Sequence, residues 1–384
     1  MLSLGRQPGF GIYIHWPFCL SKCPYCDFNS HASASIDQER WRRALVTELS
    51  YYARWKPGET VTSIFFGGGT PSLMEPATTA ALIEAVHRHW PVDPMIEITL
   101  EANPSTVEAQ RFADFRAAGI NRLSLGVQAL NQADLHFLGR GHDVIEALTA
   151  LDLAAKIFPR FSFDLIYARP GQTLTTWQAE LVQALALAGD HLSLYQLTIE
   201  EGTAFFPAHA RGDFLLPDDE MAADMFALTR DLATQAGLPA YEISNHARPG
   251  GESRHNLTYW RGGEYVGIGP GAHGRLNHTA TRQHRAPDVW LRRVEADGHA
   301  SQGTQALDAK TRAEELVMMG LRLNEGLNAQ HFHQQCGQKL DQVMDAHVCA
   351  QLQGDGLLAR TEQGWRATEA GLLVLNTLTA AVLR

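Results

Sequence analysis

Short apolar runs alternate with longer amphipathic stretches over the first two thirds of the chain. Runs rich in β-branched and aromatic residues predict strands. They are Gly11–Trp16, Ser63–Phe66, Ile96–Glu101, Arg122–Val127, Phe161–Ile166, His191–Leu197 and Ala240–Ser244. Apolar residues at helical spacing predict helices between them, among them Gln38–Ala53, Ala77–His89, Thr106–Ala118, Val144–Lys156 and Glu220–Ala236. Parallel neighbouring strands need long crossovers, usually helices, so this alternation predicts an α/β fold with a parallel sheet closed into a barrel or partial barrel.

The pattern changes after residue 245. Residues 248–275 are glycine-rich and predict an irregular segment, whereas the chain beyond residue 305 is helical in pattern. Leu357–Arg360, a turn at residues 362–364 and Trp365–Ala367 predict a small hairpin next to helices, as in a winged helix. We therefore expect a core domain over residues 1–245, a glycine-rich connecting segment over 246–304 that closes the cavity, and a C-terminal helical, winged-helix-like domain over 305–384.

Composition and charge narrow the classes of partner. The chain has 384 residues, of which 45% are apolar, and its formal net charge is −10. An acidic chain has no general attraction to nucleic acid, and the last helical run, residues 369–384, has one arginine and no lysine. DNA binding by the winged-helix-like domain is therefore not expected. With no signal-peptide pattern and no apolar run long enough to cross a bilayer, the predicted location is cytoplasmic.

Three of the five cysteines, Cys19, Cys23 and Cys26, lie within eight residues directly after a predicted strand. Clustered cysteines in a reducing compartment indicate metal binding. Three thiolates would leave one iron of a [4Fe–4S] cluster with an open coordination position, where a reactant can bind. The alternative is a zinc knuckle completed by His15 or His31, as in a zinc-stabilised regulatory protein. The other two cysteines, at positions 336 and 349, are expected to be packing residues.

Further polar or glycine-rich segments follow predicted strands, namely Gly67–Pro71, Glu101–Pro104 and Gln128. Barrel folds gather their active sites at the carboxyl ends of the strands. Three successive glycines allow a ligand to approach the backbone closely, although they could also form a tight turn before Pro71. A buried Glu101 carboxylate would need a partner, which a cationic or hydroxyl-bearing ligand would supply.

The C-x3-C-x2-C spacing resembles the signature of the radical S-adenosylmethionine (SAM) superfamily. Five motifs in order, Tyr13–Cys19, Phe65–Ser72, Leu125–Gln128, Asp164–Tyr167 with Pro170–Thr173, and Leu194–Thr198, resemble the oxygen-independent coproporphyrinogen III dehydrogenase family. The resemblance implies a radical SAM partial (β/α) barrel in which Cys19, Cys23 and Cys26 hold a [4Fe–4S] cluster whose open iron takes SAM. The implied SAM-site residues are Tyr13, Tyr25, Gly68, Gly69, Thr70, Glu101, Gln128, Arg140 and Asp164.

Within that family the chain resembles the heme chaperone (HemW-type) branch. The enzymatic branch has a longer N-terminal arm and a further cysteine two residues after the third cluster ligand, where this chain has Phe28. Residues 23–30, the Glu-Ala-Asn-Pro motif and the His-Asn-x-x-Tyr-Trp motif at 255–260 match the chaperone branch. The resemblance implies heme as cargo and delivery to apo-hemoproteins such as those of the respiratory chain, with transient contact with membrane proteins. The alternative function is the anaerobic enzyme, which converts two propionates of coproporphyrinogen III to vinyl groups.

The same motif indicates a heme ligand. A neutral imidazole is a good axial ligand for heme iron, so His255 is the tentative ligand, with Tyr259 and Trp260 against the macrocycle. A hydrogen-bonded structural histidine is the alternative interpretation of His255. His273, at the end of the glycine-rich segment 267–273, is the secondary candidate.

Overall fold

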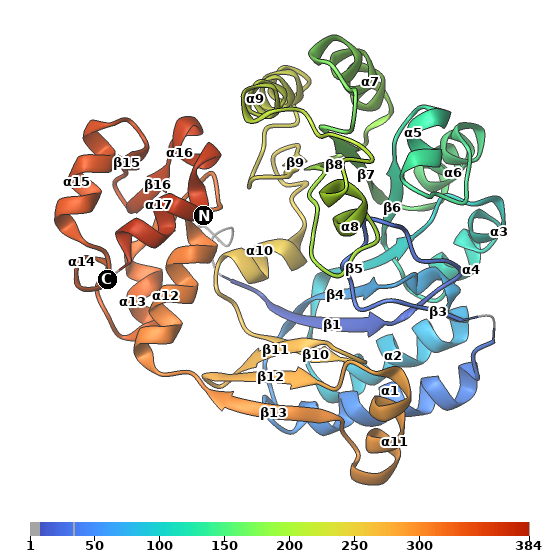
Figure 1. Ribbon diagram of the computed structural model, residues 1–384. Coiled ribbons are helices and arrows are strands. Elements are labelled where there is room, and N and C mark those ends of the chain that lie inside the picture. Colours follow the sequence, from blue (N-terminus) through green and yellow to red (C-terminus); the bar gives the residue numbers. More distant parts are fainter. Residues whose placement is uncertain (1–7, 34, 384) are drawn as a thin grey trace.

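The fold is built on one long sheet (Figure 1). The computed structural model describes residues 8–33 and 35–383. Its 11-stranded sheet has the order β13-β12-β11-β10-β1-β4-β5-β6-β7-β8-β9. The strands are β1 (Phe10–Trp16), β4 (Val61–Gly68), β5 (Val92–Ala102), β6 (Arg122–Gln128), β7 (Arg160–Tyr167), β8 (His191–Gln196), β9 (Asn245–Ala247), β10 (Tyr265–Ile268), β11 (His273–Leu276), β12 (Thr279–Gln283) and β13 (Ser301–Ala306). Neighbouring strands from β10 through β1 to β8 pair in parallel, and the strands at both edges pair antiparallel.

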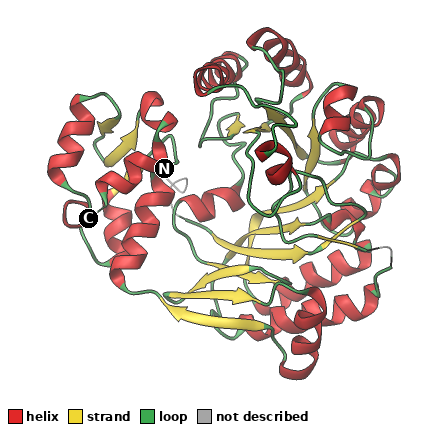
Figure 2. Ribbon diagram, viewed as in Figure 1, coloured by secondary structure: helices red, strands yellow, loops and turns green. Residues whose placement is uncertain are grey.

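Helices cover the outer face of this curved sheet (Figure 2). They are α1 (Gln38–Ala53), α2 (Pro76–His89), α3 (Thr106–Ala109), α4 (Phe112–Ala117), α5 (Gln132–Phe137), α6 (Val144–Ile157), α7 (Leu174–Leu187), α9 (Asp219–Gln235) and α11 (Pro287–Asp297). The short α8 (Phe205–Ala210) lies instead by the cysteine loop, where Phe205 N–H donates to Pro24 O over 2.9 Å. The arrangement confirms the predicted α/β partial barrel. Among the described residues, no helix combines the length and apolar character needed to cross a bilayer.

Alternation along the strands separates an apolar outside from a polar inside. In β5, Ile98 and Leu100 are buried in the main hydrophobic core, whereas the residues between and beside them are Glu97, Thr99 and Glu101. Successive side chains of a strand point to opposite faces, so the apolar set packs under the helices and the polar set lines the barrel. The sequence of each strand thus both closes the core and supplies the interior groups of the site.

Two predicted elements differ from the observed ones. The single helix predicted over Thr106–Ala118 is broken into α3 and α4, and at the break the Arg111 guanidinium donates hydrogen bonds to two carbonyl groups of the loop after β4. The strand predicted over Ala240–Ser244 begins later, as β9. Its expected residues instead form a bend, in which the Glu242 carboxylate accepts a hydrogen bond from the backbone N–H of Ser244 over 2.9 Å.

The glycine-rich segment is more regular than predicted. It contains α10 (Arg254–Trp260) and then β10 to β12, which extend the sheet beyond β1. Gly269, with φ of +92°, and Gly271, with φ of +79°, allow the tight turn between β10 and β11. The expectation of an irregular segment was therefore wrong, because β10 pairs in parallel with β1 at the edge of the sheet, and β11 and β12 then add antiparallel. Such pairing stabilises short strands that have weak sequence patterns.

A separate small core forms the C-terminal part. Its elements are α12 (Ala309–Gly320), β14 (Leu327–Asn328), α13 (Ala329–Cys336), α14 (Leu340–Val343), α15 (Ala346–Gly354), β15 (Leu358–Arg360), β16 (Gly364–Ala367), α16 (Glu369–Leu373) and α17 (Leu375–Val382). β15 and β16 form the predicted hairpin. Cys349 is buried in this core and Cys336 packs against it, as expected of packing residues. The boundaries proposed for the three parts stay a prediction.

The C-terminal part packs against α10 (Figure 1). Arg261 forms an ion pair with Glu325 over 2.7 Å. The Arg322 guanidinium lies over the ring of Trp260, 4.5 Å from the ring centre. An ion pair of 2.8 Å between Glu315 of α12 and Arg275 of β11 places α12 next to this part of the sheet.

Candidate functional site

The three clustered cysteines lie on one loop at the carboxyl end of β1. Cys19 ends the two-residue strand β2 (Phe18–Cys19), which pairs in parallel with β3 (His31–Ala32), and Cys23 and Cys26 lie between these strands. Backbone hydrogen bonds fix the loop to the end of β4: Gly69 N–H donates to Trp16 O over 2.7 Å, and Thr70 N–H donates to Phe18 O over 2.8 Å. The cysteine loop and the glycine run therefore form one unit.

Each thiol has a polar neighbour. The Arg140 guanidinium donates to Cys23 Sγ over 3.3 Å, and the Thr70 hydroxyl donates to Cys19 Sγ over 3.4 Å. Cys26 Sγ lies 3.7 Å from the Ser30 hydroxyl. At Cys19 burial raises the pKa of the thiol, although the hydrogen bond from Thr70 acts in the opposite direction. A bound metal would displace the thiol proton, because the thiolate is the form that binds metals.

The arrangement fits a cluster better than a single ion. Across residues 8–33 and 35–383, no three His, Cys, Asp or Glu side chains are grouped closely enough to hold one metal ion. In a [4Fe–4S] cluster each cysteine binds a different iron, so the three sulfur atoms need not lie as close together as they would around a single ion. His15, the zinc ligand considered from sequence, has both ring nitrogens in hydrogen bonds, to Tyr13 Oη at 3.0 Å and to Asn29 O at 2.9 Å. His31 is exposed, and its Nε2 lies 3.3 Å from Asn29 Oδ1.

The cysteine loop faces a cavity of about 230 Å³, which we call the cysteine cavity. Eight of the nine residues predicted for SAM line it together with the three cysteines: Tyr25, Gly68, Gly69, Thr70, Glu101, Gln128, Arg140 and Asp164. The ninth, Tyr13, lines a neighbouring cavity. Residues from the ends of β4 to β7 thus meet at one place, as expected for carboxyl ends of parallel strands.

Buried carboxylates give this cavity unusual electrostatics. Burial, with a further contribution from the nearby Asp164, raises the pKa of Glu101 to about 8. Glu101 Oε2 accepts a hydrogen bond from Gly68 N–H over 3.2 Å. Burial also raises the pKa of Asp164 to about 6. A bound cation would favour the ionised form of both groups, so the pair is suited to a positively charged ligand.

The backbone is constrained around the cavity. Gln128 has φ of +72°, an uncommon conformation for a residue with a side chain, at a register shift between β6 and β7. A Cβ on Gly69 would lie 2.7 Å from the Phe18 carbonyl oxygen. The glycine run is therefore required by packing against the cysteine loop as well as by any ligand.

Sequence reasoning missed Asn103. Its Oδ1 accepts from Arg140 over 2.5 Å and its Nδ2 donates to Thr70 Oγ1 over 3.2 Å, so it joins the side chains that contact Cys23 and Cys19. The Glu-Ala-Asn-Pro motif contained this residue, but its contacts depend on how three loops meet.

A second cavity of about 570 Å³, which we call the arginine cavity, adjoins the first. It shares Phe28, Gly68 and Glu101 with the cysteine cavity. Aromatic side chains and four arginines contribute to its walls, namely Tyr13, Phe28, Tyr259, Trp260, Tyr265, Arg275, Arg282, Arg285 and Arg312. Phe28, which replaces the further cysteine of the enzymatic branch, is 58% exposed where the two cavities meet.

His255 lies on α10 and lines neither cavity. Its side chain is only 1% exposed, with Nδ1 3.0 Å from Ser63 Oγ and Nε2 2.6 Å from Tyr259 Oη. The ring stacks on Phe65, with ring centres 4.9 Å apart, and burial lowers the pKa of His255 to about 3. Its role as a heme ligand stays a prediction, and ligation would require both hydrogen bonds to break.

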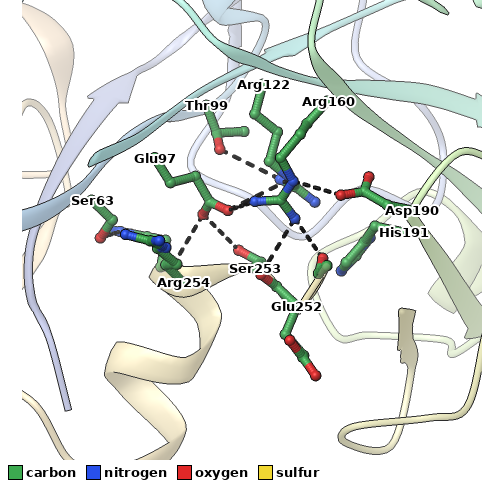
Figure 3. Close-up of polar contacts among 12 residues, drawn as sticks. Ser63, Glu97, Thr99, Arg122, Arg160, Asp190, His191, Glu252, Ser253 and Arg254 are labelled. Carbon is green, nitrogen blue, oxygen red and sulfur yellow. Dashed lines mark hydrogen bonds and ion pairs between the residues drawn. The ribbon is translucent and has the colours of Figure 1, made fainter. Parts of the chain in front are cut away.

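A buried polar network holds the amino end of α10 (Figure 3). Glu97 of β5 forms an ion pair with Arg160 of β7 over 2.7 Å. The same carboxylate accepts hydrogen bonds from Ser253 Oγ over 3.3 Å and from the His255 backbone N–H over 3.2 Å. The network lies at the amino ends of β6 and β7, whereas the cysteine cavity lies at the carboxyl ends of the strands.

Comparisons with known proteins agree with this architecture. Residues 13–184 match the radical SAM superfamily, and residues 307–374 match the HemN C-terminal domain. The heme chaperone HemW of Escherichia coli is 38% identical over 97% of this chain and 98% of its own length. Radical S-adenosyl methionine domain-containing protein 1, mitochondrial, of Danio rerio is 39% identical over 97% of this chain and 86% of its own.

A solved structure shares the fold over nearly the whole chain. Coproporphyrinogen III oxidase (HemN) from Escherichia coli superposes with a TM-score of 0.81 at 24% identity, covering 99% of this chain and 91% of that chain. The partial barrel and the cysteine loop at its carboxyl end define a radical SAM protein. More narrowly, the chain belongs to the family that includes the heme chaperone HemW.

Proposed function

We propose that this protein binds heme and transfers it to apo-hemoproteins. The observation that carries the proposal is the similarity to the heme chaperone HemW, which spans 97% of this chain. Phe28 at the junction of the cavities, where the enzymatic branch has a cysteine, supports the chaperone over the anaerobic enzyme. Recipients such as respiratory-chain hemoproteins, transient contact with membrane proteins and a cytoplasmic location are parts of the same proposal.

We assign the cysteine cavity to a [4Fe–4S] cluster and SAM. Cys19, Cys23 and Cys26 would ligate the cluster, and Arg140 would donate to a ligating sulfur. When bound, such a cluster supplies an open iron and one electron to SAM. Glu101 and Asp164 would hold the positively charged groups of SAM, while the backbone at Gly68 and Gly69 permits its close approach.

Product analysis and heme titration test the function together. Anaerobically reconstituted protein is incubated with SAM, a reductant and coproporphyrinogen III, and the same preparation is titrated with heme and then mixed with apomyoglobin. We expect about four irons per chain with matching acid-labile sulfide, saturable heme binding, heme transfer and no porphyrinogen turnover. Protoporphyrinogen IX formed over many turnovers would favour the enzyme, and zinc in place of iron and sulfide would refute the cluster.

A further inference from the structure

The arginine cavity concentrates positive charge in an acidic chain. Glu315 of α12 pairs with Arg275 over 2.8 Å and with Arg312 over 3.3 Å. Arg282 and Arg285 are exposed, and neither forms an ion pair with any other described residue. Two guanidinium groups are therefore available to an anionic ligand, and the same charges disfavour a sulfonium cation such as SAM in this cavity.

The arginines and a histidine share one face of the sheet. His273 on β11 lies directly opposite Arg282 on β12, and Arg275 follows His273 by two residues and lies opposite Tyr265 on β10. Residues two apart on a strand point to the same side, so this ladder presents an imidazole beside guanidinium groups. All four side chains line the arginine cavity.

The His273 imidazole is suited to bind iron. Its side chain is exposed, and its ring makes no hydrogen bond with another described residue. Partial burial and the nearby arginines, Arg282 first among them, lower the pKa of His273, which favours the neutral ring that coordinates metals. His255, in contrast, is buried with both ring nitrogens engaged.

The remaining walls fit a flat apolar ring. Phe28, Trp260 and Met319 contribute apolar surface, and the volume of about 570 Å³ falls in the range typical of cavities that take ligands of this kind. Heme combines a flat macrocycle, two carboxylates at one edge and an iron that accepts imidazole. These three requirements correspond to the aromatic walls, to Arg282 with Arg285, and to His273.

We infer that the arginine cavity is the heme site, with Arg282 and Arg285 binding the propionates and His273, rather than His255, supplying the axial nitrogen. This inference rests on the proposed function, because it assumes that heme is the cargo.

Comparing heme with heme dimethyl ester tests the propionate contacts. Wild-type protein should bind heme more tightly than the ester, whose carboxylates are blocked, and the double variant Arg282→Gln, Arg285→Gln should lose about tenfold or more of that preference. The control, Arg292→Gln with Arg293→Gln on exposed positions of α11, removes the same charge outside the cavity and should keep the preference. An unchanged preference in the cavity variant would overturn the propionate assignment.

Absorbance and resonance Raman spectra of the heme complex test the axial ligand. His273→Ala should lose the imidazole-ligated spectrum and regain it with added imidazole, whereas the control His347→Ala, at an exposed position of α15, should keep it. A spectrum lost in His255→Asn but kept in His273→Ala would overturn the ligand assignment. Wild-type protein that binds no heme would instead refute the proposed function.

Discussion

Arg140 and Cys23 are joined by a hydrogen bond of 3.3 Å from a guanidinium nitrogen to the thiol sulfur. The other terminal nitrogen of Arg140 donates to Gly126 O over 2.8 Å and to Asn103 Oδ1, so the charge is held in place from both sides. A fixed cation beside one cysteine makes the three cysteine positions electrostatically unequal. The sulfur of Cys23 accepts a hydrogen bond from a guanidinium group, whereas the sulfurs of Cys19 and Cys26 have hydroxyl neighbours.

Replacing Arg140 by Gln should make the cluster harder to reduce. Loss of a positive charge and of a donor to sulfur disfavours the added electron, so the midpoint potential should become more negative. Potentiometric titration followed by EPR measures this, with Arg88→Gln, an exposed position on α2, as the control. Equal potentials at equal iron content would show that Arg140 has no such influence.

Gly69→Ala should displace the cysteine loop. The added Cβ would lie 2.7 Å from the carbonyl oxygen of Phe18, a backbone atom that cannot move without shifting Cys19. We expect a lower melting temperature and reduced iron incorporation on reconstitution. Gly303→Ala on β13 meets no atom within 4 Å and is the matched control. Normal iron content in Gly69→Ala would mean that the loop adapts.

Glu101 should make the apo-protein's stability depend on pH. Its pKa rises from 4.5 in the unfolded chain to about 8 in the fold, chiefly through burial. The folded state therefore retains a proton between these values that the unfolded state has lost, and stability falls as the pH rises through this window. The Glu101→Gln variant has no carboxyl group at this position and should not lose stability in this way.

Urea unfolding of the apo-protein at pH 5 and pH 8 measures the effect of Glu101. From pH 5 to pH 8, we expect the free energy of unfolding of Glu101→Gln to increase relative to that of the wild type. The control Glu201→Gln, at an exposed loop position, should change with pH as the wild type does. Parallel curves for all three proteins would contradict the raised pKa.

His255→Ala should cost stability more than heme affinity. The change removes hydrogen bonds to Ser63 and Tyr259 and a ring packed on Phe65, for an expected loss of about 2–4 kcal/mol. The pKa of His255 falls from 6.5 unfolded to about 3 folded, so the wild type loses stability as the pH falls below 6.5.

The stability loss caused by His255→Ala should therefore be smaller at pH 5 than at pH 7.5, as denaturant unfolding at both pH values would measure. The Arg282→Gln, Arg285→Gln protein serves as the comparison, because its stability should remain close to that of the wild type at both. A loss of equal size at pH 5 and pH 7.5 would show that the imidazole titrates normally in the fold.

The barrel and the grouping of the cysteine loop, the glycine run and the polar residues at its carboxyl end were predictable because both depend on local signals. The strand patterns of β4 to β8, the cysteine spacing and the glycine run each lie within a few residues, and parallel topology brings their ends together. Cavity contacts such as Asn103 with Arg140 could not be predicted, since they join loops 37 residues apart. The grouping of His273, Arg275 and Arg282 could not be predicted either. It depends on the register of two short antiparallel strands, in a segment whose sequence pattern is irregular.

The shared wall of the two cavities has a thermodynamic consequence. Phe28, Gly68 and Glu101 border both cavities, so a ligand in one cavity changes the surroundings of a ligand in the other. Linkage is reciprocal, and any factor by which the first occupant changes the affinity for the second applies equally in the opposite direction. A cationic occupant that ionises Glu101 in the cysteine cavity would change the electrostatics of the arginine cavity. Under the proposed function, this single carboxyl group would couple the state of the cofactor to the retention or release of the cargo.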